Sequence, residues 1–248
     1  MKISIITIAY NSGHSIADAI QSVLSQTYPD IEYVIVDGKS KDNTVEVVKS
    51  FGNRISKFVS EPDKGIYDAL NKGIRMATGD VIGFMHSDDL FAADDIIEKV
   101  ATLFAKNNVD SIYGDLEYVY KNDTNKVLRY WKSGEFSIRK LKMGWMPPHP
   151  TFYVKKAVYD KYGLFNTNFR IAADYDTILR FLGKHRISTM YLPEVMVKMR
   201  VGGASNRSLK NIIKKTKEDM QAIQDNQFGS LFTLAFKNLR KLTQFVVK

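Results

Sequence analysis

The first 115 residues alternate short apolar runs with segments of helical periodicity, and no other feature of the sequence constrains the fold as tightly. Ile3–Ile8 is a compact run rich in β-branched residues, and it predicts a buried strand. The apolar residues between Ile16 and Leu24 recur at helical spacing and predict a helix. This alternation favours an α/β fold with a mainly parallel central sheet and helices on both faces. Further strands are expected at Ile31–Val36, Lys57–Ser60, Val81–Met85 and Ser111–Gly114, and further helices at Thr44–Phe51, Gly65–Ala77 and Asp94–Lys106.

The pattern changes after Asp115. Leu116–Tyr120 and Lys126–Trp131 alternate like antiparallel strands, and the proline-rich stretch Gly144–Pro150 predicts a loop. Further strands are expected at Thr151–Val154 and Thr189–Arg200, and helices at Asp174–Gly183, Leu209–Gln224 and Leu231–Val247. We therefore expect one α/β domain over residues 1–205, with halves at 1–115 and 116–205, followed by basic helices over residues 206–248.

The formal charge of +9 is concentrated near the C-terminus of the 248-residue chain. Residues 206–248 contain nine basic and three acidic side chains and so hold +6 of that charge. A local basic segment indicates an anionic partner, either membrane lipid or nucleic acid. The chain has no cysteine, which excludes disulfides and thiolate metal sites. Because the sequence lacks a run of about 20 apolar residues and a signal-peptide core, we expect a cytoplasmic protein.

Polar residues follow three of the expected strands, at Tyr10-Asn11, at Asp37 and at Asp88-Asp89. In open α/β sheets, ligands bind beyond the carboxyl ends of the strands, so these residues mark a candidate site. Asp88 and Asp89 have two interpretations: one of them caps the next helix, or the pair binds a hard cation such as Mg²⁺ or Mn²⁺ together with diphosphate oxygens. Asp37 is either a turn residue before a glycine or a carboxylate that accepts an N–H from a nucleobase.

Three further residues have a structural and a functional interpretation. Asp174 and Asp176 lie at the start of an expected helix, where carboxylates usually cap the helix or interact with its dipole. The alternative is a general base that accepts a proton from a hydroxyl. His149 lies between two prolines, either in a purely structural loop or in the wall of an acceptor pocket.

Four stretches together resemble family-2 glycosyltransferases with the GT-A fold, namely Ile3–Ser12, Gln26–Thr44, Ser60–Asp89 and Ala173–Phe181. The resemblance covers about residues 1–205 and is closest to bacterial enzymes that build capsule, exopolysaccharide or lipopolysaccharide. It implies a Rossmann-like GT-A catalytic domain with a small antiparallel region on the acceptor side. The order and spacing of the stretches are much more specific than any single motif.

The resemblance also implies a binding site for a nucleotide-sugar donor, with uracil as the expected base. Tyr10, Asn11 and Asp37 would hold the nucleobase. Lys64 and Asp68 would flank the donor pocket.

The same resemblance implies an inverting, metal-assisted reaction. Asp88 would contact the ribose, and Asp89 would coordinate Mn²⁺ or Mg²⁺ beneath the diphosphate. Asp174 would be the general base. Arg200 and Ser205 would close over the diphosphate.

Two positions depart from the family pattern. The family often has Glu-Asp at the position of the base, and this chain has Ala173 before Asp174. The family often has an amide or apolar residue where this chain has His86. We expect Asp174 to keep its role in a changed environment.

We therefore expect transfer of a sugar, from a UDP-sugar by preference, to a hydroxyl of a glycan or lipid-linked acceptor in surface polysaccharide synthesis. Four alternatives stay open: a polyprenyl-phosphate glycosyltransferase, a nucleotidyltransferase, a catalytically dead relative and a basic nucleic-acid-binding module. Against nucleic acid as a partner, the positive charge is confined to the tail and no recognition motif appears.

The basic tail has two interpretations of its own. In one, it packs on the catalytic domain or on another subunit of a homo-oligomer. In the other, it lies on anionic lipid at the inner face of the plasma membrane. Both rest on its last helix, where the apolar residues Ala235, Leu239, Leu242 and Val246 alternate with Lys237, Arg240, Lys241 and Lys248.

Overall fold

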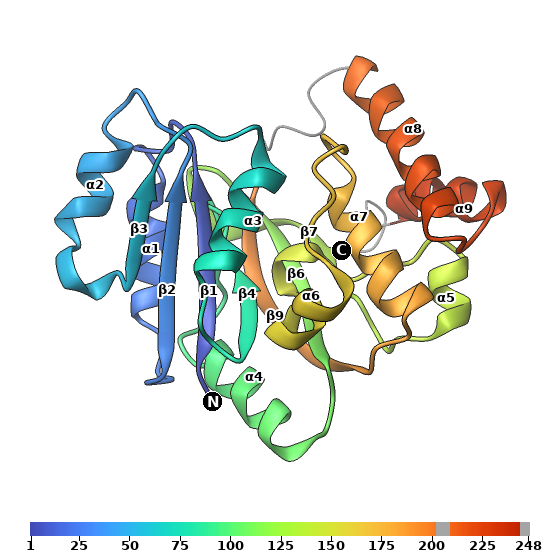
Figure 1. The fold of residues 1–248 in the computed structure, drawn as a ribbon, viewed down its shortest axis with the longest axis horizontal. Helices are drawn as coiled ribbons and strands as arrows, with labels where there is room; N and C mark the ends of the chain where they lie inside the picture. The colour runs from blue at the N-terminus through green and yellow to red at the C-terminus, as the bar shows by residue number, and fades with distance from the viewer. Residues whose placement is uncertain (202–208, 244–248) are drawn as a thin grey trace.

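A computed structural model describes residues 1–201 and 209–243, in which nine strands form one mixed sheet flanked by helices (Figure 1). Four parallel strands form its first part, in the spatial order β3, β2, β1, β4. Their bounds are β1 Ile3–Ala9, β2 Ile31–Asp37, β3 Lys57–Ser60 and β4 Val81–Phe84. These strands were all predicted, and the carboxyl ends of β1, β2 and β4 lie at the same edge of the sheet.

Helices cover both faces of the sheet, as the alternating pattern predicts. One face packs on α1 (Ile16–Leu24), α2 (Thr44–Ser50) and α4 (Ile96–Lys106), which bury apolar side chains against β1 and β2. The other face packs on α3 (Ile66–Met76) and α6 (Lys156–Tyr162). Residues that alternate along β1 separate accordingly, because Ile5 belongs to the first core and Ile6 to the second.

The second half of the sheet mixes strand directions. β8 (Tyr153–Lys155) lies antiparallel between β4 and β6 (Ser111–Tyr120). β6 pairs in parallel with β9 (Thr189–Arg200) and antiparallel with β7 (Asp123–Trp131). A short strand, β5 (Leu90–Phe91), pairs antiparallel with the far side of β9. The predicted antiparallel pair is confirmed, whereas the order of strands and the parallel pairing of β6 with β9 did not follow from the local pattern.

Two predicted strands form a single strand in the structure. The predictions Ser111–Gly114 and Leu116–Tyr120 are both parts of β6, which continues through Asp115. An irregularity in the register with β9 lies between Tyr113 and Asp115, so the period-two pattern breaks there without ending the strand. Gly114 fits this place because a Cβ atom would collide with the side chain of Met196.

The helices near the predicted base differ in detail from expectation. The expected helix Asp174–Gly183 is α7 (Ala173–Ile178), which continues as a π-helical segment over Leu179–Lys184. Two short helices, α5 (Ile138–Lys142) and α6, were not predicted. The five residues of α5 are too few to show a helical period. The expected loop Gly144–Pro150 is irregular, apart from a 3₁₀ turn over His149–Thr151.

The C-terminal helices α8 (Leu209–Asp225) and α9 (Leu231–Thr243) pack against the rest of the protein. Gly144 has φ +75°, and a Cβ atom there would lie 2.5 Å from the amide nitrogen of Lys237 on α9. This close approach supports the packing interpretation of the tail for the inner face of α9. The predicted tail residues Val246 and Lys248 lie outside the described residues. In the part of the chain that the structure describes, no helix is long and apolar enough to cross a membrane.

Candidate active site

The loops that follow β1 and β2 are joined by hydrogen bonds that involve two predicted nucleobase residues. Asn11 has a positive φ of +50°, its backbone N–H donates to Ser40 Oγ (2.8 Å), and its side-chain oxygen accepts from the N–H of Lys41 (2.8 Å). The carboxylate of Asp37 is fully buried and accepts hydrogen bonds from Ser40 and from the hydroxyl of Ser60 (2.6 Å). Asp37 thus fixes the shape of its loop.

Tyr10 stands beside these two residues with its side chain 59% exposed, although aromatic residues bury most of their surface elsewhere in this core. Its ring also lies close to Gly38, the residue after Asp37. An exposed aromatic ring at the carboxyl edge of the sheet offers a flat apolar surface for a planar ligand.

Asp88 and Asp89 follow β4 at the same edge. Asp89 is fully buried, and its Oδ1 accepts the backbone N–H of Arg200 at 3.1 Å. Among the residues that the structure describes, its Oδ2 is buried and has no hydrogen-bond partner. Burial raises the pKa of Asp89 well above its usual range, the charge of Asp88 adds to this increase, and Arg200 acts against it. A buried carboxylate with one free oxygen is energetically costly unless a cation or a proton satisfies it.

Asp89 is also held in place from β9, whose last residue is Arg200. The guanidinium of Arg200 donates to the backbone oxygen of Asp88 (3.1 Å) and forms an ion pair with Asp18 of α1 (2.6 Å). Both contacts keep the guanidinium at the edge of the predicted diphosphate region. Ser205, predicted to act with Arg200, lies outside the described residues.

Asp89 fits the role of a ligand to a divalent cation. Its unpartnered oxygen is a hard donor of the kind that Mg²⁺ and Mn²⁺ prefer. Within residues 1–201 and 209–243, no group of three or more His, Cys, Asp or Glu side chains is arranged to hold a metal ion. The protein would therefore supply few of the ligands, and a bound diphosphate would have to supply others.

Two histidines lie next to one another near the carboxyl end of β4. The rings of His86 and His149 are 5.9 Å apart between centroids, and His149 also packs against Phe84 (5.1 Å). Burial lowers the pKa of His149 to about 3, and the charge of His86 lowers it further. Burial also lowers the pKa of His86, while the charges of Asp88 and Asp174 both act to raise it. His86 therefore lies within electrostatic reach of both carboxylates.

Asp174 occupies the first turn of α7 and is half-buried, with one carboxylate oxygen accepting the N–H of Tyr175 at 2.8 Å. The segment that leads into this turn is held by Glu218 of α8. The Glu218 carboxylate accepts the backbone N–H groups of Ile171 (2.7 Å) and Ala172 (3.0 Å), as well as that of Arg170. Glu218 was not singled out from the sequence, where it follows a lysine-rich stretch and resembles a solvated surface charge.

Asp176 points away from this site. It is buried, its Oδ1 accepts from Asn226 Nδ2 (2.8 Å), and its Oδ2 lies 3.4 Å from a guanidinium nitrogen of Arg180. The structure therefore gives Asp176 contacts with Asn226, the residue after α8, and with Arg180 of the π-helical segment, in place of the predicted position on the acceptor side. The physical reason is helical spacing, because residues two apart on a helix face different directions.

Lys64 and Asp68 lie at the start of α3 and are linked to the segment before α7. The N–H of Lys64 donates to Asp68 Oδ2 (3.0 Å), and the carbonyl of Lys64 accepts from Arg170 Nη1 (2.8 Å).

Besides Glu218, the sequence did not reveal a second carboxylate, that of Asp115 on β6. It is buried and accepts from Tyr191 Oη (2.8 Å), from the N–H of Ser133 (2.7 Å) and from the hydroxyl of Tyr130.

Comparison with known proteins gives a consistent picture. The family model for glycosyl transferase family 2 matches residues 4–163. An uncharacterized glycosyltransferase of Mycobacterium tuberculosis is 33% identical over 182 residues, which are 72% of this chain and 68% of the relative. The match to the family model ends before Asp174, so the position of that carboxylate rests on the geometry described above.

Solved structures with the same fold include two proteins with bound nucleotides. The structure of Staphylococcus aureus TarS 1–349 in complex with UDP has a TM-score of 0.70 and 19% identity, and covers 91% of this chain. This chain spans 66% of the length of that solved chain. The mannosyltransferase PcManGT from Pyrobaculum calidifontis, in complex with GDP-Man and Mn²⁺, has a TM-score of 0.66 and 16% identity, with 96% of this chain and 68% of that chain covered. At these identities the likeness shows the fold alone, and it confirms the predicted GT-A architecture.

Proposed function

This chain belongs to glycosyl transferase family 2, and from that premise we propose that it transfers a sugar from a nucleotide-sugar donor to an acceptor hydroxyl with inversion at the anomeric carbon. The observation that carries the proposal is a chain of contacts between the end of β4 and the start of α7. The ring of His86 lies near that of His149 (5.9 Å), which packs on Phe165 (5.5 Å). Phe165 stacks on Tyr67 (5.8 Å), whose hydroxyl donates to the backbone oxygen of Ile171, three residues before Asp174 (2.7 Å). This chain of contacts supports the proposal that the carboxylates following β4 and the carboxylate in the first turn of α7 serve one site. A group transfer needs both at once, because one side holds the leaving group while the other accepts a proton.

The donor would bind at the carboxyl ends of β1, β2 and β4. The exposed ring of Tyr10 would stack on the nucleobase, and the loops held together by Asn11 and Asp37 would form the rest of its pocket. Since the carboxylate of Asp37 is buried and already accepts three hydrogen bonds, it would act by positioning the loop. We propose a UDP-sugar because TarS binds UDP in the same fold, while the GDP-Man complex of PcManGT leaves guanine as the alternative base.

The diphosphate of the donor would lie near Asp88, Asp89 and Arg200, with Lys64 and Asp68 beside the sugar. A divalent cation bound at Asp89, either Mn²⁺ or Mg²⁺, would neutralise negative charge on the leaving nucleoside diphosphate. The free oxygen of Asp89 supports this assignment, as does the Mn²⁺ in the PcManGT complex. Arg200 would add a fixed positive charge at the end of β9.

Asp174 would accept the proton of the acceptor hydroxyl. As the hydroxyl oxygen forms a bond to the anomeric carbon, the bond from that carbon to the diphosphate oxygen breaks, and the proton moves to a carboxylate oxygen of Asp174. One of these oxygens already accepts the N–H of Tyr175, which leaves the other for the hydroxyl. A single displacement of this kind inverts the anomeric centre and forms no covalent enzyme intermediate.

The acceptor we propose is a hydroxyl of a glycan or a lipid-linked glycan in bacterial surface polysaccharide synthesis. Its support is the resemblance of the motifs in residues 1–205 to such enzymes. The half-buried ring of His149, close to His86, would line the acceptor side of the site.

The proposal is tested by nucleotide release from UDP-GlcNAc and GDP-Man, measured with a panel of simple glycosides as acceptors. Asp174→Asn should lower turnover by about 100-fold or more, the usual contribution of a general base, while nucleotide affinity stays within about twofold. A matched control is Asp160→Asn, which removes an exposed carboxylate that pairs with Lys156 on α6. Normal turnover by Asp174→Asn, or a product with retained anomeric configuration, would refute the mechanism.

A further inference from the structure

Among the described side chains of helix α9, four large apolar ones face solvent while the charged Lys237 faces the protein interior. Thr233, Leu234 and Lys237 are buried on the inner face. The outer face exposes Leu231, Phe232, Phe236 and Leu239, with exposed fractions of 69%, 77%, 41% and 56%. At 100° per residue these four side chains fall on one side of the helix. The arrangement is the reverse of an ordinary surface helix, whose apolar side faces the core.

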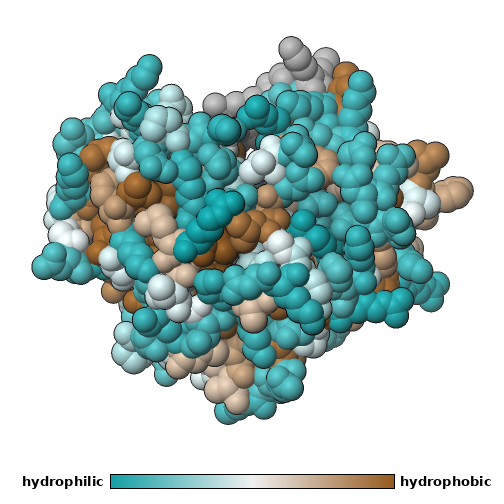
Figure 2. Space-filling model, viewed as in Figure 1, coloured by the Kyte–Doolittle hydropathy of each residue, from teal (hydrophilic) through white to brown (hydrophobic). Residues whose placement is uncertain are grey.

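This outer face is a protruding surface. Figure 2 shows apolar side chains, coloured brown, standing out at the edge of the molecule where Figure 1 places α9. Single exposed apolar residues are common, but a helix face with two phenylalanines and two leucines is a contiguous patch. Such a patch normally has a partner.

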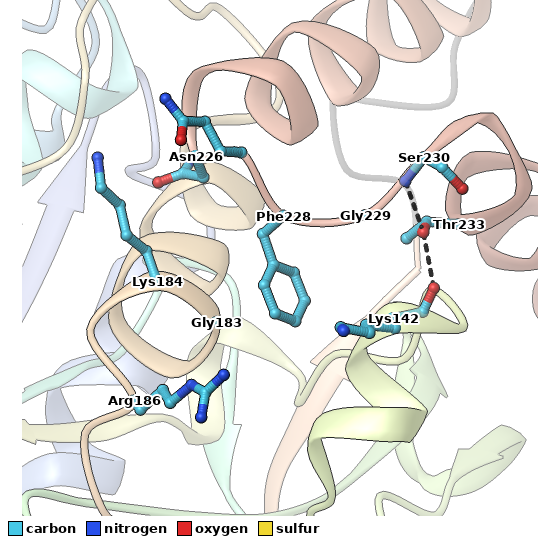
Figure 3. Close-up of a pocket in the computed structure, with 10 residues that line it drawn as sticks. Lys142, Gly183, Lys184, Arg186, Asn226, Phe228, Gly229, Ser230 and Thr233 are labelled. Carbon is cyan, nitrogen blue, oxygen red and sulfur yellow. Dashed lines mark hydrogen bonds between the residues drawn. The ribbon is translucent and has the colours of Figure 1, made fainter.

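A cavity of about 620 Å³ adjoins the start of α9 and carries positive charge. Its lining includes Lys142, Lys184 and Arg186, and no acidic side chain of the described residues. Figure 3 shows the ammonium of Lys142 and the guanidinium of Arg186 pointing toward one another beneath the ring of Phe228, whereas Lys184 points away. Two exposed cations that face one space without an acidic partner are suited to a phosphate group.

We propose that the outer face of α9 and the cations of this cavity form a docking surface for an anionic lipid bilayer. The phenylalanines and leucines would enter the boundary between headgroups and acyl chains, and Lys142 and Arg186 would bind lipid phosphates. An interfacial helix needs both an apolar face and nearby basic residues, and the structure supplies them from different elements. The surface is independent of the transfer reaction, although a lipid-linked acceptor of the proposed function would lie at the same membrane.

Charge argues against a second copy of this chain as the partner. In a symmetric dimer both copies would bring the same cations to one interface, which would then hold twice the positive charge. Like charges at an interface disfavour association, whereas the negative surface of a bilayer attracts all of them.

The test is co-sedimentation of the full-length protein with vesicles of phosphatidylcholine alone, or of equal parts phosphatidylcholine and phosphatidylglycerol. We expect binding to the anionic vesicles only, weakened by salt. Phe232→Glu/Phe236→Glu should weaken this binding by about tenfold or more, because it removes two large apolar side chains from the interface. Lys142→Ser/Arg186→Asn should weaken it by about tenfold, and asparagine tolerates the positive φ of +50° at residue 186.

Two matched controls separate this surface from general effects. Leu128→Glu makes the same kind of change at a 48% exposed residue of β7, and Lys49→Ser/Lys106→Ser removes two exposed cations from α2 and α4. Both controls should bind vesicles as the wild type does, and all variants should keep nucleotide affinity, which is measured separately so that failure of the proposed function is recognised on its own. A wild type that does not bind anionic vesicles overturns the proposal, as does equal binding by Phe232→Glu/Phe236→Glu. A dimer that this variant dissociates, with no vesicle binding, assigns the face to a second copy and overturns it too.

Discussion

Replacing Lys237 with methionine should destabilise the protein strongly, because the lysine ammonium neutralises the buried carboxylate of Asp219. The two charged atoms are 2.6 Å apart, and the side chains are 5% and 2% exposed. The ammonium also lies 3.2 Å from the centre of the Tyr175 ring on α7. This cluster therefore joins α8, α9 and the helix that begins with the proposed base.

The magnitude follows from burial. Removing one partner of a buried ion pair leaves an uncompensated charge and costs about 3–5 kcal/mol, whereas an exposed pair is worth about 0–1 kcal/mol. Methionine keeps most of the volume of the lysine side chain, so the loss of stability measures the contribution of the positive charge and of its contact with Tyr175. The double variant Asp219→Leu/Lys237→Met removes both charges, and it should lose less stability than Lys237→Met alone.

Urea unfolding of the wild type, the two single variants and the double variant measures the coupling directly. Burial lowers the pKa of Lys237 to about 8, so the measurement is made at pH 7, where the ammonium is charged. A loss below about 1 kcal/mol for Lys237→Met, or single losses that simply add in the double variant, would refute the reasoning.

Two more predictions concern the fold. Gly144→Ala should lower the free energy of unfolding in urea by about 2 kcal/mol or more, because φ is +75° and the new Cβ would meet the backbone of α9. Gly134→Ala, at φ +66° with open space around it, should cost only the backbone strain of about 1 kcal/mol. Equal losses of stability in the two variants would contradict the argument from close packing. Burial acts to raise the pKa of Glu32, but hydrogen bonds, led by the one from Lys57, outweigh it and lower that pKa to about 2. The ionised carboxylate therefore contributes stability above its ordinary pKa of 4.5 that is lost as pH falls toward 2, and the advantage of the wild type over Glu32→Gln should fade across that range. A difference that stays constant with pH would contradict this.

Local periodicity predicted the elements that are long or buried on a clear pattern. β3 and β9 have the bounds that the sequence indicated, and the helices on both faces follow from the alternation in the first half. Local periodicity did not predict the strand pairing in the second half of the sheet, because the position of β8 between β4 and β6 depends on contacts distant in sequence. One such contact is Gly83 of β4, where a side chain would collide with the ring of Tyr153 on β8.

The candidate site shows the same division. Asp37, Asp88 and Asp89 were located by their places after strands, and the structure brings them to one edge of the sheet. Resemblance to a family was needed for Asp174. Glu218 could not be found from the sequence, because its partners are backbone groups 46–48 residues away.

The tail illustrates why composition alone is a poor guide to burial. The sequence pattern groups Lys237 with the basic residues that alternate with apolar ones, and a surface position is one of its two interpretations. The structure places its ammonium in the interior and leaves Phe232 and Phe236 outside. The direction that a helix faces depends on what it packs against, here Gly144 and Asp219.

Calorimetric titration of UDP and GDP, each with and without Mn²⁺, on the wild type and on Asp89→Ala, tests the central claim most directly. We predict that one nucleotide binds the wild type more tightly when Mn²⁺ is present, and that Asp89→Ala loses this enhancement because the buried free oxygen of Asp89 is gone. Equal enhancement in Asp89→Ala, or no binding of either nucleotide to the wild type, would contradict the account of a metal-assisted nucleotide-sugar site.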